Sequence, residues 1–142
     1  MPYHTKVTFR FIGPGVFPKD ITTKLGVFPT FSGRKGDPIL HQPGQTYPAS
    51  CWGLVISNDS SLDEQLRDLV AALDGKSPVI KSILKDGVRG SILCGCFVNN
   101  ECGEFITITP ETLAAVASIG VPLELDVYSD YEVGRDPLCQ YP

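Results

Sequence analysis

The sequence lacks any long apolar run, and no stretch approaches the roughly 18 residues that a membrane span requires. Its first residues, Met1 to Lys6, also lack the apolar core of a secretion signal. The chain holds five cysteines, and an odd number without such a signal indicates free thiols in a reducing compartment. We therefore expect a cytoplasmic protein with no membrane partner.

Positive charge is also limited, because 12 lysines and arginines stand against 16 aspartates and glutamates, a net charge of −4. A general nucleic-acid binder needs a basic face to displace counterions from phosphates, so we expect no nucleic-acid partner. The cations concentrate in residues 1–35 and the acids in residues 121–142. This split favours chain ends that lie side by side, and a basic surface for an anionic partner is the alternative.

Histidine is scarce, since only His4 and His41 are present. Neither lies in a Gly-x-Ser-x-Gly elbow, and no Ser-His-Asp order can be defined. Cys51 and His41 have a spacing that allows a thiol-imidazole pair, which is the one enzymatic alternative. We assign no catalytic residue and favour a protein that is not an enzyme.

A metal site also lacks its usual pattern. Structural zinc takes two ligand pairs with two to four residues between partners, whereas Cys94, Cys96 and Cys102 do not follow that spacing. Cys94 and Cys96 share one face of an expected strand, where thiols pack well in a core. We therefore expect core packing for these thiols, no metal and no cofactor.

What the chain does contain is enough material for one domain. It has 142 residues, of which 42% are hydrophobic and 20% charged, and such a chain buries a core without disulfide or metal support. We expect a single domain over residues 1–142, with its core in about residues 6–128 and a tail over 129–142.

The periodicity of apolar residues predicts the elements. Strands are expected at 6–12, 52–57, 91–99 and 123–128, with a short hairpin strand at 104–108 after a turn at Asn99-Asn100. Helices are expected at 18–25, at 62–73 behind a Ser61–Glu64 capping box, from Ser77 to Gly87, and from Thr109 to Gly120.

This order predicts an α+β fold with a mainly antiparallel sheet of four or five strands and helices packed on one face, ferredoxin-like or related. In that layout the first and last strands are neighbours, and Arg10 pairs with Glu124 or Asp126. One sheet face carries Phe9, Trp52, Cys94 and Leu125 into the core. The other is too apolar to remain wet, with Ile12, Val55, Leu93, Phe97 and Tyr128. Either the 29–50 loop covers it through Phe31 and Tyr47, or a second molecule does.

The 29–50 loop is rich in proline and glycine and is long for a compact domain, which is typical of functional loops. Within it, Gly33-Arg34-Lys35-Gly36-Asp37-Pro38 combines glycines that allow close backbone approach with two cations. A solvated turn with two surface cations is the favoured interpretation, and anion binding by Arg34, Lys35 and Gly36 is the alternative, which makes these three the candidate ligand-binding residues. The stretch lacks the P-loop pattern.

The run from Asp20 to Thr30, with its Ile-Thr-x-x-Leu-Gly-x-x-Pro-Thr pattern, precedes Arg34-Lys35-Gly36-Asp37 and then Trp52. Together with the leucine helix and the closing strand, this order resembles the uncharacterised, mostly bacterial domain-of-unknown-function family 4279 over about residues 6–128. The family offers no catalytic residues to transfer. The resemblance implies that Pro29, Lys35, Gly36 and Trp52 belong to one structural unit, so Trp52 joins the candidate ligand-binding residues.

The function is therefore unknown from sequence, and three hypotheses remain. The favoured one is a non-enzymatic protein-interaction module, with toxin immunity as a narrower form, whose partner is another protein or a second copy. The first alternative is a small-anion or nucleotide sensor that uses the 33–38 loop. The second is an enzyme that uses Cys51 or another thiol.

Overall fold

The computed structural model of the chain describes residues 3–98 and 105–129. Several sequence predictions fall outside these residues: the Asn99-Asn100 turn, Cys102, Glu104, Cys139 and all but the first residue of the 129–142 tail. None of the helices in the described part is long and apolar enough to cross a membrane.

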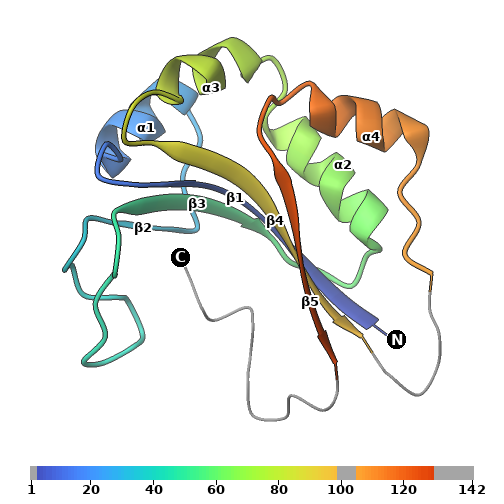
Figure 1. The fold of residues 1–142 in the computed structure, drawn as a ribbon, viewed down its shortest axis with the longest axis horizontal. Coiled ribbons are helices and arrows are strands. Elements are labelled where there is room, and N and C mark those ends of the chain that lie inside the picture. The colour runs from blue at the N-terminus through green and yellow to red at the C-terminus, as the bar shows by residue number, and fades with distance from the viewer. Residues whose placement is uncertain (1–2, 99–104, 130–142) are drawn as a thin grey trace.

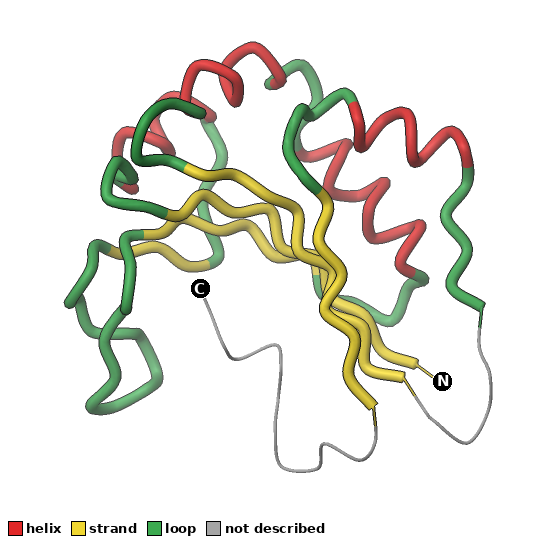
Figure 2. Tube along the Cα trace, viewed as in Figure 1, coloured by secondary structure: helices red, strands yellow, loops and turns green. Residues whose placement is uncertain are grey.

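Within the described residues, a five-stranded mixed sheet forms one layer and four helices form the other (Figures 1 and 2). The strands are β1 (Tyr3–Ile12), β2 (Phe31–Gly33), β3 (Cys51–Ile56), β4 (Arg89–Val98) and β5 (Leu123–Ser129). Their spatial order is β2-β3-β1-β4-β5, and every neighbouring pair is antiparallel except β4 and β5. The fold is thus α+β with a mostly antiparallel sheet, as predicted.

The helices are α1 (Pro18–Leu25), α2 (Leu62–Ala72), α3 (Ser77–Ile83) and α4 (Pro110–Ala117). Several of their ends follow the predicted capping signals, whereas α3 ends at Ile83 and not at Gly87 as predicted. Gly26 closes α1 in the left-handed conformation at φ 69°, which costs a residue without Cβ little. The Ser61 hydroxyl accepts from the Glu64 amide at 3.2 Å, and the Thr109 hydroxyl from the Thr112 amide at 3.3 Å.

The strand order corrects one prediction. β1 and β5 are not neighbours, because β4 pairs with β1 on one side and with β5 on the other. The connection from β4 through α4 to β5 is a parallel crossover, and it places β5 outside β4. Arg10 nevertheless reaches across β4 to Glu124, with 3.5 Å between guanidinium and carboxylate, which confirms that predicted pair.

Two smaller predictions also differ. Residues 105–108 form no strand and lead in irregular conformation to the α4 cap. The short edge strand β2 lies inside residues 29–50, which were expected to be irregular throughout. The strand was not predicted because its three residues show no alternation of apolar and polar side chains. The third residue, Gly33, has no side chain that could extend an alternating pattern.

The core lies between the sheet and the helices. Phe9 and Trp52 are fully buried there, with ring centroids 6.3 Å apart and near-perpendicular planes. Cys94 and Cys96, 0% and 1% exposed, belong to the same cluster, which confirms core packing for both thiols. Full burial of one such aromatic side chain contributes about 1.5–3 kcal/mol to folding.

Candidate binding surface

The sheet face opposite the helices, here called the helix-free face, collects polar and apolar side chains in cross-strand rows. Because register partners share a face, Lys6, Gly95 and Asp126 form one row across β1, β4 and β5. Thr8 and Leu93 lie in the next row, which continues to Val55 on β3 and Glu124 on β5. The predicted division of residues between the two faces is therefore confirmed, but the prediction that Leu125 enters the core is wrong, because it lies on the outer strand β5 and is 60% exposed.

Two glycines on this face accept aromatic rings from the chain that follows α1. A Cβ built on Gly53 would lie 2.1 Å from the ring of Phe31, and one on Gly33 would lie 2.4 Å from the ring of Tyr47. Only glycine lets these rings lie so close to the strands. Phe31 and Tyr47 thus cover the β2–β3 end of the face, as predicted.

The segment of residues 34–50 leaves β2 on the helix-free side and returns to β3 (Figure 1). It is more ordered than expected. Pro38 and Thr46 form a bridge, and the Ile39 amide donates to the Gln45 carbonyl at 3.0 Å. The Tyr47 amide donates to the Asp37 carbonyl at 2.9 Å. These bonds give the segment a defined, hairpin-like path.

A hollow of about 500 Å³ lies between this segment and the sheet. Its lining is mixed: the apolar members include Phe31, Ile39, Leu40, Val55 and Leu93, and the polar members include Lys6, Thr8, Thr30, Ser32, His41, Gln42 and Asp126. Leu40 is 78% exposed although it is a large apolar residue. A concave surface on which apolar side chains lie beside polar groups can hold part of a ligand.

The side chain of Arg34, the first candidate anion ligand, makes hydrogen bonds and a ring contact within the protein. Its guanidinium donates to the carbonyls of Pro14 at 3.0 Å and Val16 at 2.9 Å and lies 4.3 Å from the centroid of the Phe17 ring. These contacts join the loop to the turn before α1. The side chain therefore holds the loop in place.

The loop amides that an anion would need also have partners. The amide of Arg34 donates to the Asp37 carboxylate, that of Lys35 to the Ser50 hydroxyl and that of Gly36 to the Tyr47 carbonyl, each at 2.9 Å. Anion binding at residues 33–38 stays a prediction, and it would have to displace these bonds beside a carboxylate.

Trp52, the fourth predicted ligand residue, lies apart from the other three. It faces the helices, is fully buried, and its indole donates to the Thr22 hydroxyl at 3.0 Å. The resemblance implied that Trp52 and Lys35 belong to one structural unit. The Lys35 amide donates to the Ser50 hydroxyl, so the loop is bonded to the residue just before β3. The indole itself contacts the core.

The thiols in the described part are poorly suited to nucleophilic catalysis. Burial raises the pKa of Cys51 to about 11 and that of Cys94 to about 12, so both are neutral thiols at pH 7. Burial also raises the pKa of Cys96. Among the described residues, no group of three or more His, Cys, Asp or Glu side chains could hold a metal.

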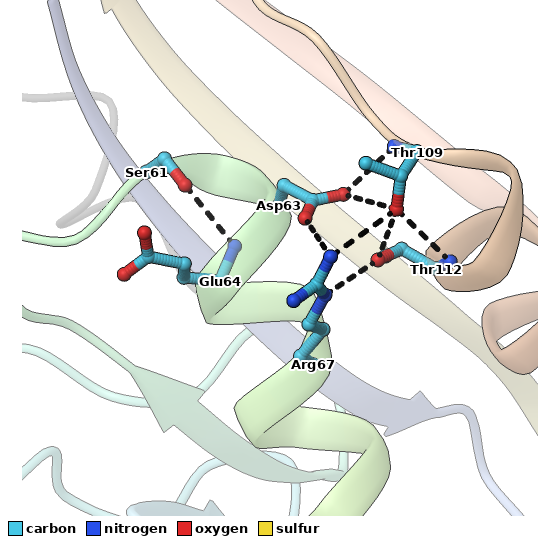
Figure 3. A network of polar contacts seen from close by, with 6 residues as sticks. All are labelled: Ser61, Asp63, Glu64, Arg67, Thr109 and Thr112. Carbon is cyan, nitrogen blue, oxygen red and sulfur yellow. Dashed lines mark hydrogen bonds and ion pairs between the residues drawn. The ribbon is translucent and has the colours of Figure 1, made fainter.

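A second polar cluster joins α2 to α4 (Figure 3). The Asp63 carboxylate accepts from the Thr109 amide at 2.8 Å and pairs with Arg67 at 3.0 Å. Arg67 in turn donates to the Thr112 hydroxyl at 3.0 Å. The Thr109 amide bond, assisted by Thr112 and Arg67, holds the pKa of Asp63 below its usual range. The cluster caps and positions α4, and its groups satisfy one another.

The hollow was not predicted as a site from the sequence. The candidate residues Arg34, Lys35 and Gly36 lie in the segment that forms its outer wall, but Leu40, Val55 and Leu93 line it. The available signal was the apolar pair Ile39-Leu40 inside a loop rich in proline and glycine.

One family model matches residues 2–130, and its description is "Domain of unknown function (DUF4279)". This match confirms the resemblance found in the sequence. No curated protein and no solved structure matches the chain.

Proposed function

We propose that this chain, which belongs to the DUF4279 family, is a non-enzymatic interaction module that binds an extended segment of a protein partner. The observation that carries the proposal is the hollow of about 500 Å³ on the helix-free face, where apolar and polar side chains lie together. Its size lies within the range of about 300–1,000 Å³ that is usual for binding pockets.

The walls of the hollow are preformed in the chain without a partner. Phe31 and Tyr47 rest against glycines of the sheet, and backbone bonds hold the 34–50 segment in a defined path. A preformed surface binds with less loss of conformational freedom than a loop that must order on contact. The hollow therefore suits a binding role.

The lining specifies the chemistry of the partner segment. Val55 and Leu93 on the sheet and Leu40 on the loop offer contacts for one large apolar side chain. Lys6 and Asp126, opposite charges on the same row, can fix the orientation of a peptide backbone or a polar neighbour. We expect a partner segment with an apolar anchor flanked by polar residues.

A display selection of random twelve-residue peptides on the intact chain tests this function, with affinities of the enriched peptides measured by fluorescence anisotropy. Leu40→Asp should weaken the selected peptides about tenfold or more, because a Leu side chain buried on binding contributes roughly 1.5–3 kcal/mol. Leu40 is already exposed, so the variant should keep its fold.

Leu113→Asp is the matched control, since Leu113 is also exposed but lies on α4, on the other side of the sheet. It should change the affinities by less than about threefold, as expected for a residue outside the interface. The proposal is wrong if no peptide is enriched, or if the enriched peptides bind Leu40→Asp as tightly as the unmodified chain.

We also propose a cytoplasmic location for this module. The support is that Cys51, Cys94 and Cys96 are free thiols, all buried in the folded chain. Free thiols of this kind are typical of proteins in a reducing compartment.

A further inference from the structure

The outer edge of β5 is the second unusual surface of the molecule. Leu125 and Val127 face the helix side of the sheet, yet each is 60% exposed. Their neighbours on β4 in the same rows, Cys94 and Cys96, are almost fully buried. Among the described residues, β5 pairs with β4 alone. The apolar face of the sheet therefore extends one strand further than the packing that covers it.

The backbone of β5 has a defined direction at this edge. The Ile92 amide donates to the Pro122 carbonyl at 2.8 Å, so in this parallel pair the even-numbered residues of β5 point their amides and carbonyls toward β4. Because these directions alternate along a strand, the amides and carbonyls of Leu123, Leu125 and Val127 point outward. They provide a template on which another strand can pair.

The charges on β5 identify the strand that fits. Glu124 and Asp126 alternate with the apolar residues and face the other side of the sheet. A second copy of β5 paired antiparallel would place these acids opposite one another, and like charges directly opposite are destabilising. A strand that carries lysine or arginine at those positions would instead form cross-strand ion pairs, and at Glu124 its cation would join the Arg10 guanidinium that already lies 3.5 Å from that carboxylate.

We infer that the β5 edge accepts an extended segment of a different protein, in which apolar residues alternate with lysine or arginine. This strand addition uses the outer edge of β5 and shares only Asp126 with the lining of the hollow, so it does not depend on the proposed function. The added strand would pair with the outward groups of Leu125 and Val127, shield both side chains, and place its basic residues beside Glu124 and Asp126.

A capped seven-residue peptide of alternating valine and lysine is the probe, matched to the length of β5, and its partner probe carries glutamate in place of lysine. Fluorescence anisotropy with the full chain should show saturable binding of the lysine peptide. The glutamate peptide should bind about tenfold or more weakly, because like-charge juxtaposition opposes association. Added salt should weaken the lysine peptide.

Leu125→Pro removes an outward amide but no bond to β4, and proline is tolerated at such edge positions. It should weaken the lysine peptide about tenfold, whereas Leu125→Thr, which keeps the amide, should weaken it less. Thermal unfolding of both variants confirms that they fold. Asp126→Lys provides a second readout, because it should reduce the preference for lysine over glutamate even if Leu125→Pro is unstable.

Equal binding of the two peptides would overturn the inference, as would unchanged binding to Leu125→Pro. A dimer in sedimentation that Leu125→Pro dissociates would also overturn it, in favour of a second copy of the chain. Leu40→Asp separates the two proposals, since it should leave the lysine peptide unaffected while it weakens peptides that bind the hollow.

Discussion

The two faces of the sheet share the same strands but are organised differently. On the helix side, Phe9, Trp52 and Ile92 are fully buried in one continuous cluster. On the helix-free face, the side chains of Val55 and Leu93 remain partly accessible beneath a loop. Period-2 alternation places both sets, but only helical packing makes the first set a core.

This difference indicates which face of the sheet stabilises the fold and which face is accessible for binding. Phe9 packs against the rings of Phe11 and Trp52, with 5.1 Å between its centroid and that of Phe11. The helix-free face instead uses glycines to seat two rings and leaves a hollow beside them. We interpret the helix side as the stabilising face and the other as the recognition face.

The strongest test of this comparison is truncation of one residue on each face. Phe9→Ala should lower the free energy of unfolding by about 3–5 kcal/mol, because it removes a fully buried ring and leaves a cavity. Val55→Ala should cost only about 1 kcal/mol, since its side chain is half-buried. Chemical denaturation of both variants measures the two values. Equal losses would remove the distinction between the faces.

A smaller effect is expected where a ring rests on the helix-free face. Gly53→Ala should cost about 1–3 kcal/mol, because the added methyl group meets the Phe31 ring. In a Phe31→Ala background the same change should cost much less, and a double-mutant cycle isolates this coupling. If the two substitutions are additive in denaturation, the ring does not rest on Gly53.

The smallest effect should come from the charged cluster within the helix layer. The folded-state pKa of Asp63 is lowered, so its contribution to stability is intact above the unfolded value of about 3.9. That contribution is lost as pH falls through the lower folded value. The stability difference between the unmodified chain and Asp63→Asn should therefore be largest near neutral pH and shrink in acid.

Urea denaturation of both proteins at several pH values measures this difference. Arg67→Gln serves as a comparison, because it removes the ion pair but leaves the stronger Thr109 amide bond to Asp63. A difference between the unmodified chain and Asp63→Asn that grows as pH falls would contradict the assignment.

Local signals in the sequence predicted much of the fold. The Ser61 and Thr109 caps, the αL glycine after α1 and the alternation of β1 depend on neighbouring residues alone, and each is confirmed. The Arg10–Glu124 pair was also predicted, although β4 lies between its strands. Strand order depends on how a crossover passes over the sheet, which local patterns do not encode.

The candidate site was harder to predict, for a related reason. Arg34 looks like an anion ligand in sequence, but its guanidinium meets two carbonyls from the turn before α1, about twenty residues away along the chain. Leu40, Val55 and Leu93 come together only after the 34–50 segment folds over the sheet. Contacts between distant segments decide which side chains are occupied and which remain available.

The most direct test of the recognition face is nuclear magnetic resonance of the ¹⁵N-labelled chain, titrated with the tightest peptide from the display selection. The account predicts the largest amide shift changes at Leu40, Val55 and Leu93, around the hollow. Changes confined to α2 and α4, with the amides of the hollow unmoved, would contradict it.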